Sequence, residues 1–352
     1  EPAMTDIPQT MSGVILTGHG GPEVLEHRTD LPVPVPGPGD VLIRVGAAAV
    51  NNTDINTRLA WYSKGAGASD DASWSGEPIR FPRIQGIDVC GRIADVGAGV
   101  YPARIGERVL VEPCLVEAAG KRCDPPWFLG SECDGGFAQF TRVAARHAHR
   151  VDCALTDVEL ASFPCSYSTA ENMLTRAAVG SDDTVLVTGA SGGVGSAAVQ
   201  LARARGARVI AFSSAARAGS LRALGAAEVG DRSEDPLKAL GRESVDVVID
   251  LVAGPGFPIL LELLRRGGRY AVAGAVGGPE VTLDVRTLYL KDLKFFGCTV
   301  LEPEVFGNLV RRIERGEIRP LVAQTFALHD IVRAQEAFAA KGFTGKIVLT
   351  IP

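Results

Sequence analysis

Residues 184–207 read TVLVTGASGGVGSAAVQLARARGA, and this stretch decides the fold. Residues 184–188 form a short apolar run, typical of a strand that is buried on both faces. A turn with four glycines follows it directly. The apolar residues after the turn recur at helical spacing: Val194, Ala197, Ala198, Leu201 and Ala202. The stretch therefore predicts a strand, a glycine turn and a helix.

This arrangement is typical of a binding site for a dinucleotide. Glycines permit a tight turn and a close approach of the pyrophosphate, while the free N–H groups and the helix dipole favour its negative charge. The alternative is a glycine-rich turn that binds nothing. We expect the phosphates to contact Gly189, Ala190, Ser191, Gly192, Gly193, Val194 and Gly195.

The composition describes a globular protein with room for two domains. The chain has 352 residues, of which 46% are hydrophobic and 22% charged, and a net charge of −5. This charge does not favour a nucleic acid or an anionic membrane as partner. The first ten residues lack the basic and apolar regions of a signal peptide. Seven cysteines, an odd number scattered along the chain, favour reduced thiols. We therefore expect a cytoplasmic protein.

Short strands and turn residues dominate the first 160 residues, which suggests a small, irregular β-barrel-like domain. A proline-rich linker covers residues 32–39, where a helix cannot form. A long segment without periodicity covers residues 61–83. It could be a lid over an active site or a disordered surface loop. We expect strands at residues 14–17, 41–45, 90–96, 108–111 and 137–143.

From residue 157 onward, helices and strands alternate, which predicts a doubly wound parallel sheet. We expect the segment at 160–178 to be one helix. The last segment should pack against the first domain. The expected strands after the glycine turn are 208–212, 245–250, 269–273, 293–300, 322–327 and 346–351, and the expected helices are 215–224, 258–266, 304–315 and 329–341.

Eight short motifs, in order along the chain, resemble the medium-chain dehydrogenase/reductase superfamily and its zinc-free quinone oxidoreductase-like branch. The resemblance implies a GroES-like substrate domain (residues 1–160 and 303–352) with an inserted Rossmann domain (residues 161–302). The motifs are GPGDVLIRV at 37–45, VNNTD at 50–54, GID at 86–88, GERV at 106–109, DGGFA at 134–138, STA at 168–170, GASGGVG at 189–195 and GKIVL at 345–349.

The same resemblance predicts that a catalytic zinc is lost. Zinc members of the superfamily hold the metal with a Cys, a His and usually a second Cys, where this chain has Asn51, Ile87 and Cys165. One thiol cannot provide the tetrahedral set that zinc requires. Zinc held by unusual ligands such as Cys165 and Asp88 is the alternative. Three cysteines, at 114, 123 and 133, lack the Cys-x-x-Cys spacing of a structural zinc site.

Residues that follow the second strand favour NADP(H) as the cofactor. NAD sites place an acidic residue at the end of this strand, but no acidic residue occurs between 184 and 227. Serine hydroxyls and an arginine suit a 2′-phosphate. The candidates here are Ser213, Ser214 and Arg217, although Arg217 could be a solvated helix residue.

Without zinc, a conjugated acceptor is the easier substrate, because hydride adds to carbon and the charge spreads to a distant oxygen. We therefore expect an NADPH-dependent reductase of an enone, enal or quinone. A zinc-type alcohol dehydrogenase and a non-catalytic NADPH-binding protein are the alternatives.

The resemblance also implies positions for further site residues. Asn51 and Thr169 are expected beside the nicotinamide, or else as a turn residue and a helix cap. Tyr62 is a candidate proton donor, or a packed side chain. Asp54 is expected to anchor its loop. The remaining expected cofactor contacts are Val252, Gly274, Cys298 and Lys346. The strand at 293–300 is expected to pair with its twin in a homodimer.

Overall fold

The computed structural model describes residues 6–63 and 78–352, and the chain forms two compact units. The barrel unit contains Glu1–Cys165 and Pro320–Pro352, and the nucleotide unit contains Ser166–Arg319. The expected boundaries were 160 and 303. The second boundary lies later because helix α9 (Val305–Glu314) groups with the nucleotide unit.

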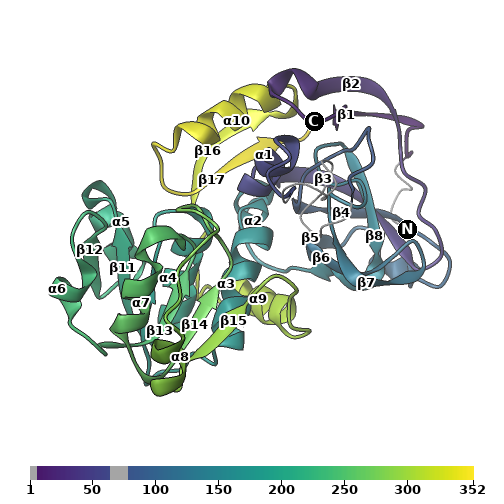
Figure 1. The fold of residues 1–352 in the computed structure, drawn as a ribbon. Helices are drawn as coiled ribbons and strands as arrows, with labels where there is room; N and C mark the ends of the chain where they lie inside the picture. Colours follow the sequence, from purple (N-terminus) through teal and green to yellow (C-terminus); the bar gives the residue numbers. More distant parts are fainter. Residues whose placement is uncertain (1–5, 64–77) are drawn as a thin grey trace. The chain divides into compact units, whose positions relative to one another are not determined.

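The nucleotide unit is built on a six-stranded parallel sheet in the order β12-β11-β10-β13-β14-β15 (Figure 1). The chain order reverses between the two central strands, and ligands bind at such a switch point in doubly wound sheets. The strands are β10 (Thr184–Val187), β11 (Arg208–Ser213), β12 (Glu228–Asp231), β13 (Val245–Asp250), β14 (Leu264–Val272) and β15 (Lys294–Gly297).

Helices connect these strands, as parallel pairing requires. Apolar residues of the central strands pack against helix α7 in one hydrophobic cluster, in which Leu186, Ile210 and Val248 lie with Leu260 and Leu261. The helices are α3 (Pro164–Arg176), α4 (Gly193–Ala204), α5 (Ala218–Leu224), α6 (Pro236–Leu240), α7 (Phe257–Leu263), α8 (Val285–Leu290) and α9.

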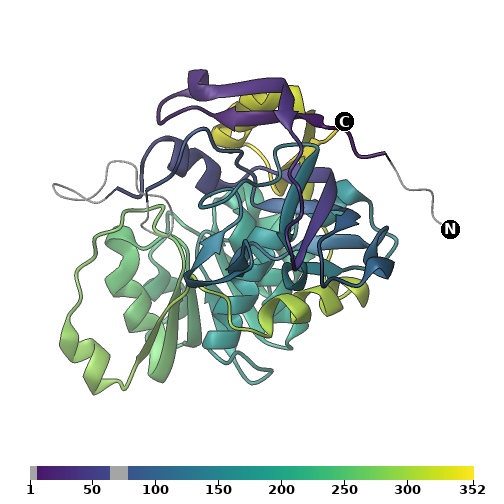
Figure 2. The same ribbon diagram turned by 90° about the vertical axis from the view of Figure 1, so that its right-hand side faces the viewer.

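A seven-stranded sheet forms the centre of the barrel unit, and the end of the chain completes it. Strand β17 pairs antiparallel with β3, as expected for a last segment that packs on the first domain. Figures 1 and 2 show the C-terminal strands and α10 beside the N-terminal hairpin. The sheet contains β3 (Asp40–Ala49), β4 (Asp88–Val96), β5 (Arg108–Val111), β8 (Phe140–Ala144), β9 (Ala148–Arg150), β16 (Val322–Ala327) and β17 (Lys346–Thr350).

In the described part of the barrel unit, two hairpins and three α-helices accompany this sheet. The hairpins pair β1 with β2 and β6 with β7. Their strands are β1 (Thr10–Leu16), β2 (Leu25–Pro32), β6 (Cys114–Ala118) and β7 (Lys121–Phe128), and the helices are α1 (Asn52–Arg58), α2 (Asp157–Ala161) and α10 (Ile331–Ala340).

Several expected elements differ in extent. The single helix expected at 160–178 is two helices, because Pro164 opens α3 and cannot continue α2. The helix expected at 258–266 ends at Leu263, where β14 begins. The edge strand expected at 293–300 is only Lys294–Gly297. No helix in the described part of the chain is long and apolar enough to cross a membrane.

Candidate functional site

The glycine turn between β10 and α4 is shaped by close backbone contacts. Gly189 has φ +57°, a left-handed conformation that glycine adopts without strain. A Cβ built on Gly195 would overlap the carbonyl oxygen of Gly189. The amide of Ala190 donates to Phe212 O at 3.3 Å, which ties the turn to β11. The backbone conformation therefore explains the glycine at position 189, and the close packing explains the glycine at position 195.

The N-terminus of α4 is left open for an anion. Gly192 is its N-cap and provides no side-chain hydrogen bond. The first N–H groups of a helix have no acceptor within the helix, and its dipole is positive at this end. Ser196 does not cover them, because its hydroxyl donates backward to Gly192 O at 2.7 Å. This turn fits a pyrophosphate.

The end of β11 carries the residues expected at the adenosine ribose. Ser213 is buried and its hydroxyl donates to Ser214 O at 3.0 Å. Ser214 caps the short 3-10 helix Ala215–Arg217, so Arg217 lies one turn beyond the strand. The register also pairs Ser213 with Asp231 of β12. This carboxylate was not expected at the corner, because it lies beyond residues 184–227.

Asp231 is the last residue of β12 and is partly exposed, with its carboxylate held by Ser233, two residues later. Its Oδ1 accepts hydrogen bonds from Ser233 N at 2.9 Å and Ser233 Oγ at 2.8 Å. These hydrogen bonds lower the pKa of Asp231 below its usual value. The end of β11, where a 2′-phosphate was expected to bind, therefore also has a negative charge beside it.

The other expected cofactor contacts in the nucleotide unit follow strand ends. Val252 and Gly274 lie two residues after β13 and β14, and Cys298 directly follows β15, at the edge where doubly wound sheets bind ligands. Gly274 packs closely, because a Cβ there would approach Leu251 O at 2.9 Å. Thr169 lies on α3 in the same unit.

A buried carboxylate fixes the loop after β13. Asp250 accepts the hydroxyl of Thr188 at 2.6 Å and the hydroxyl of Tyr270 at 2.5 Å. Its Oδ1 also accepts the amides of Val252 and Ala253. The hydroxyl bonds connect the end of β13 to its neighbouring strands, and the amide bonds fix the loop that follows β13. Asp250 therefore holds Val252 in place.

The barrel unit contains a buried polar cluster of Asn51, Asp88 and Lys346, which come from three distant parts of the chain. Asn51 Nδ2 donates to Asp88 Oδ2 at 2.7 Å, and Lys346 Nζ lies 3.2 Å from the same oxygen. Lys346 Nζ also donates to Asn51 Oδ1. All three side chains are at most 5% exposed. Lys346, which was expected at the cofactor, neutralises Asp88 and fixes the amide of Asn51.

Two further groups of this cluster have shifted pKa values. Asp54 Oδ2 accepts the amide of Asn51 at 2.8 Å in a capping box at the start of α1. Burial, assisted by the charge of Asp88, raises the pKa of Asp54 to about 7. Asp88 Oδ1 accepts the amide of Cys165 at 2.6 Å. Burial and the same carboxylate raise the pKa of the Cys165 thiol well above its usual value.

Thr53 and Gln85 were missed by sequence reasoning. The hydroxyl of Thr53, next to Asp54, and the Oε1 of Gln85 are buried and have no hydrogen-bond partner in the part of the chain that the structure describes. Gln85 Nε2 donates to Asp54 O at 3.1 Å. Buried polar atoms without partners are rare in folded proteins. The only sequence signal was their position, with Thr53 inside the motif at 50–54 and Gln85 directly before the motif at 86–88.

Tyr62 lies four residues after α1. Its hydroxyl is hydrogen-bonded to the side chain of Asn56, and burial raises its pKa to about 12. A tyrosine with this pKa is protonated at neutral pH and can act as a donor. Most of the lid expected at 61–83 lies outside the described residues.

The structure brings the sequence-predicted residues together in two separate sets. Asn51 and Lys346 share the cluster of the barrel unit, where Tyr62 also lies. The glycine turn, the serine–arginine corner, Thr169 and the strand-end residues belong to the nucleotide unit. Among the described residues, no group of three His, Cys, Asp or Glu side chains is arranged to hold a metal ion.

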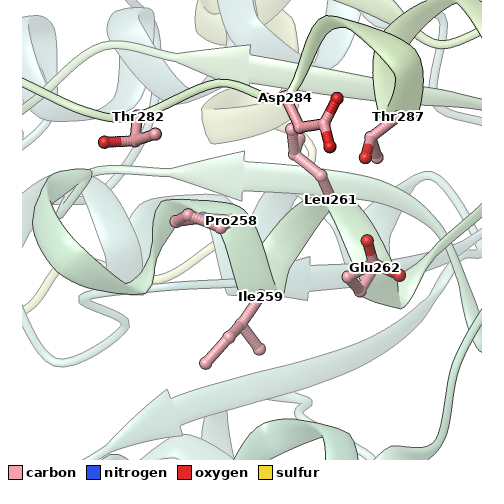
Figure 3. A pocket seen from close by; sticks show the side chains of 7 residues that line it. All are labelled: Pro258, Ile259, Leu261, Glu262, Thr282, Asp284 and Thr287. Carbon is pink, nitrogen blue, oxygen red and sulfur yellow. The ribbon is translucent and has the colours of Figure 1, made fainter.

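One shallow pocket of about 180 Å³ contains none of the expected site residues (Figure 3). It lies between α7 and the start of α8 in the nucleotide unit, with Pro258 and Ile259 on one side and Thr282 and Thr287 on the other. Asp284, at its rim, caps α8 by accepting the amide of Arg286 at 3.0 Å. Its carboxylate therefore has a structural role.

Comparison with known proteins gives consistent matches over the whole chain. Residues 37–153 match the alcohol dehydrogenase GroES-like domain, and residues 193–315 match the zinc-binding dehydrogenase family. A quinone oxidoreductase of Lama guanicoe is 30% identical over 97% of this chain and 98% of its own length. An acryloyl-coenzyme A reductase of Metallosphaera sedula is 31% identical over 97% of this chain and 100% of its own. The crystal structure of a provisional alcohol dehydrogenase from Sinorhizobium meliloti 1021 is 45% identical, with a TM-score of 0.91 over 99% of both chains.

Proposed function

Because this chain belongs to the medium-chain dehydrogenase/reductase superfamily, in its quinone oxidoreductase-like branch, we propose that it is an NADPH-dependent, zinc-free reductase of conjugated acceptors. The substrate class is an enone, an enal or a quinone. The observation that carries the proposal is the ammonium of Lys346 in the buried cluster with Asn51 and Asp88.

The buried ammonium argues against zinc at these positions. A divalent ion there would be repelled by Lys346, and the oxygens of Asn51 and Asp88 already accept hydrogen bonds. Ile87 cannot coordinate a metal, and the raised pKa of Cys165 keeps its sulfur a thiol, whereas zinc binds the thiolate. The donor set that is present does not fit a tetrahedral zinc.

The nucleotide unit fits a dinucleotide, and three residues favour the 2′-phosphate form. The close packing of Gly195 and the open end of α4 suit the pyrophosphate. Ser213, Ser214 and Arg217 provide hydroxyls and a guanidinium at the end of β11. Asp231 opposes this preference, so we expect NADPH to be favoured while NADH retains some activity.

Bound NADPH supplies the hydride, and this chain must supply a donor for the oxygen that becomes negative. Asn51 is a poor candidate, because its amide hydrogens face Asp88 Oδ2 and Ala49 O. The unpartnered hydroxyl of Thr53 is the first candidate, and the protonated hydroxyl of Tyr62 is the second. A conjugated acceptor needs only such hydrogen-bond donors, because its charge is delocalised.

The test is an activity screen of the purified protein together with a metal analysis. NADPH oxidation is measured with enones, enals, quinones and simple aldehydes, and each assay is repeated with NADH. We expect turnover of at least one conjugated acceptor with NADPH, and none of simple aldehydes. Activity should survive dialysis against a chelator.

Three results would contradict the proposal. Stoichiometric zinc that is lost together with activity would favour an alcohol dehydrogenase, which the match to the zinc-binding dehydrogenase family makes the second candidate. Nucleotide binding without turnover across the whole screen would favour a non-catalytic NADPH-binding protein. Equal catalytic efficiency with NADH would contradict the cofactor preference.

We also propose a homodimer and a cytoplasmic location. Strand β15 is one of the two edge strands of the parallel sheet, and unpaired strand edges tend to pair with another chain. Helix α8, which precedes β15, exposes Val285, Tyr289 and Leu290. The seven cysteines are all free in the structure, which supports a reducing compartment.

A further inference from the structure

A second pocket of the nucleotide unit lies at the C-terminal end of α4, away from the glycine turn. Its volume is about 380 Å³, within the range of small-molecule sites. Gln200 and Arg203 line it from α4, Ala223 from α5, and Glu317 and Arg319 from the segment after α9. Ten residues separate Gly193 from Arg203, so the pocket lies about 15 Å along the helix from the phosphate end. None of the residues assigned to the proposed reaction lines it.

Buried hydrogen bonds fix the segment that carries Arg319. Its amide donates to Gln200 Oε1 at 2.9 Å, and its carbonyl accepts from Gln200 Nε2 at 3.1 Å. Gln200 Nε2 also donates to the hydroxyl of Tyr167 at 2.8 Å, and both side chains are buried. The guanidinium of Arg319 donates to Ala223 O at 3.3 Å, which leaves further N–H groups available. The position of this arginine is therefore built into the fold.

The second arginine of the pocket has no partner of its own. Within residues 6–63 and 78–352, the guanidinium of Arg203 has neither a hydrogen bond nor an ion pair. The aliphatic part of the Arg203 side chain packs on Gly225, since a Cβ built on Gly225 would overlap the Cδ of Arg203. Glu317 is the one carboxylate that lines the pocket, and Arg312 Nη1 lies 3.1 Å from it. The pocket therefore carries an excess of positive charge.

We propose that this pocket binds a small phosphate ester. Two guanidinium groups on different elements match the several acceptor oxygens of one phosphate, and guanidinium pairs with phosphate more specifically than ammonium does. The pocket is larger than a phosphate ion, and Leu224 and Ile318 offer apolar contacts for an organic group. The ligand is distinct from the nucleotide of the proposed reaction, because the nucleotide phosphates belong at the other end of α4.

Isothermal titration of the full-length protein with phenyl phosphate tests the proposal, with sodium chloride matching the ionic strength. Each of the exposed substitutions Arg203→Gln and Arg319→Gln should weaken binding at least fivefold without changing the thermal midpoint. Glu317→Gln should strengthen binding about twofold or more, because it removes the opposing charge, while Arg312 keeps its contact with Glu171.

Arg217→Gln is the matched control, since it removes an arginine from the nucleotide corner and should leave phenyl phosphate binding unchanged. Inorganic phosphate should bind at the same place more weakly than the ester. No binding to the unchanged protein would overturn the proposal. So would binding that is lost in Arg217→Gln and retained in Arg203→Gln, because the phosphate would then occupy the nucleotide corner. These outcomes do not depend on whether the protein reduces conjugated acceptors.

Discussion

At the scale of single residues, Lys346 determines the charge balance and the hydrogen bonding of the buried cluster. Its ammonium lies 3.2 Å from Asp88 Oδ2 and is hydrogen-bonded to Asn51. Burying a carboxylate is costly unless a partner compensates it. Lys346 therefore stabilises the fold of the barrel unit, and the same contact holds the Asn51 amide away from a ligand.

We expect Lys346→Met to destabilise the protein by about 3–5 kcal/mol, because Asp88 would remain buried without its cationic partner. Urea unfolding measures this effect. Arg28→Met is the control, since Arg28 pairs with Asp30 at 2.7 Å on the surface, and its unfolding midpoint should not move. Equal small effects of both substitutions would show that the ammonium does not compensate Asp88.

Asp54 predicts a dependence of stability on pH. Its folded pKa of about 7 lies above its ordinary value of 3.8, so the folded state holds this proton more tightly than the unfolded state. Asp54 therefore stabilises the folded state fully below pH 4, and this stabilisation is lost as the pH rises through 7. Relative to Asp54→Asn, the unchanged protein should lose up to about 4 kcal/mol of unfolding free energy between pH 4 and 7. A difference that stays constant over this pH range would contradict the shift.

We expect substitutions of Arg217 and Asp231 to have opposite effects on the preference for NADPH over NADH. Arg217→Ala should raise the KM for NADPH about tenfold, a loss of about 1.4 kcal/mol, and leave the KM for NADH nearly unchanged. Asp231→Asn should lower the KM for NADPH, because it removes a negative charge that pairs in register with Ser213. Steady-state kinetics with both nucleotides checks this pair. Equal effects of Arg217→Ala on both nucleotides would remove its assignment to the phosphate.

At the scale of elements, the glycine turn and α4 are the part that the sequence predicted best. The expected strand and helix lie where β10 and α4 are found, because strand burial and helical periodicity are local signals. The strands β2, β6, β7, β9 and β12 were not predicted. Strand β2 is mostly polar and has no alternating pattern, and its pairing with β1 is the reason it forms a strand.

Gly195→Ala should weaken nucleotide binding at least tenfold, because its Cβ would overlap Gly189 O and displace the turn. Gly219→Ala is the matched control. Gly219 lies inside α5 with open space around it, so its substitution should raise stability by about 0.5–1 kcal/mol and leave binding unchanged. Fluorescence titration with NADPH and thermal unfolding measure both effects. Unchanged binding by Gly195→Ala would remove the turn from the nucleotide site.

At the scale of the whole molecule, the proposed homodimer predicts a change of mass after a single substitution. Leu290 on α8 is 57% exposed, so Leu290→Glu should convert a dimer into a monomer in light scattering after gel filtration. A glutamate in an apolar interface must give up its hydration, which opposes association. Val35→Glu, on the barrel unit, is the exposed control and should not change the mass. A monomeric unchanged protein would contradict the proposal.

The sequence alone determined the two-domain plan, the parallel sheet and the phosphate turn, because strand burial, helical periodicity and glycine conformation act over a few neighbouring residues. It also showed that Ile87 stands where zinc relatives carry a ligand. Only the tertiary structure decided the partners of buried charges. It placed Lys346 against Asp88, 258 positions earlier in the chain, and Asp231 opposite Ser213, since pairing across a sheet does not follow from local sequence.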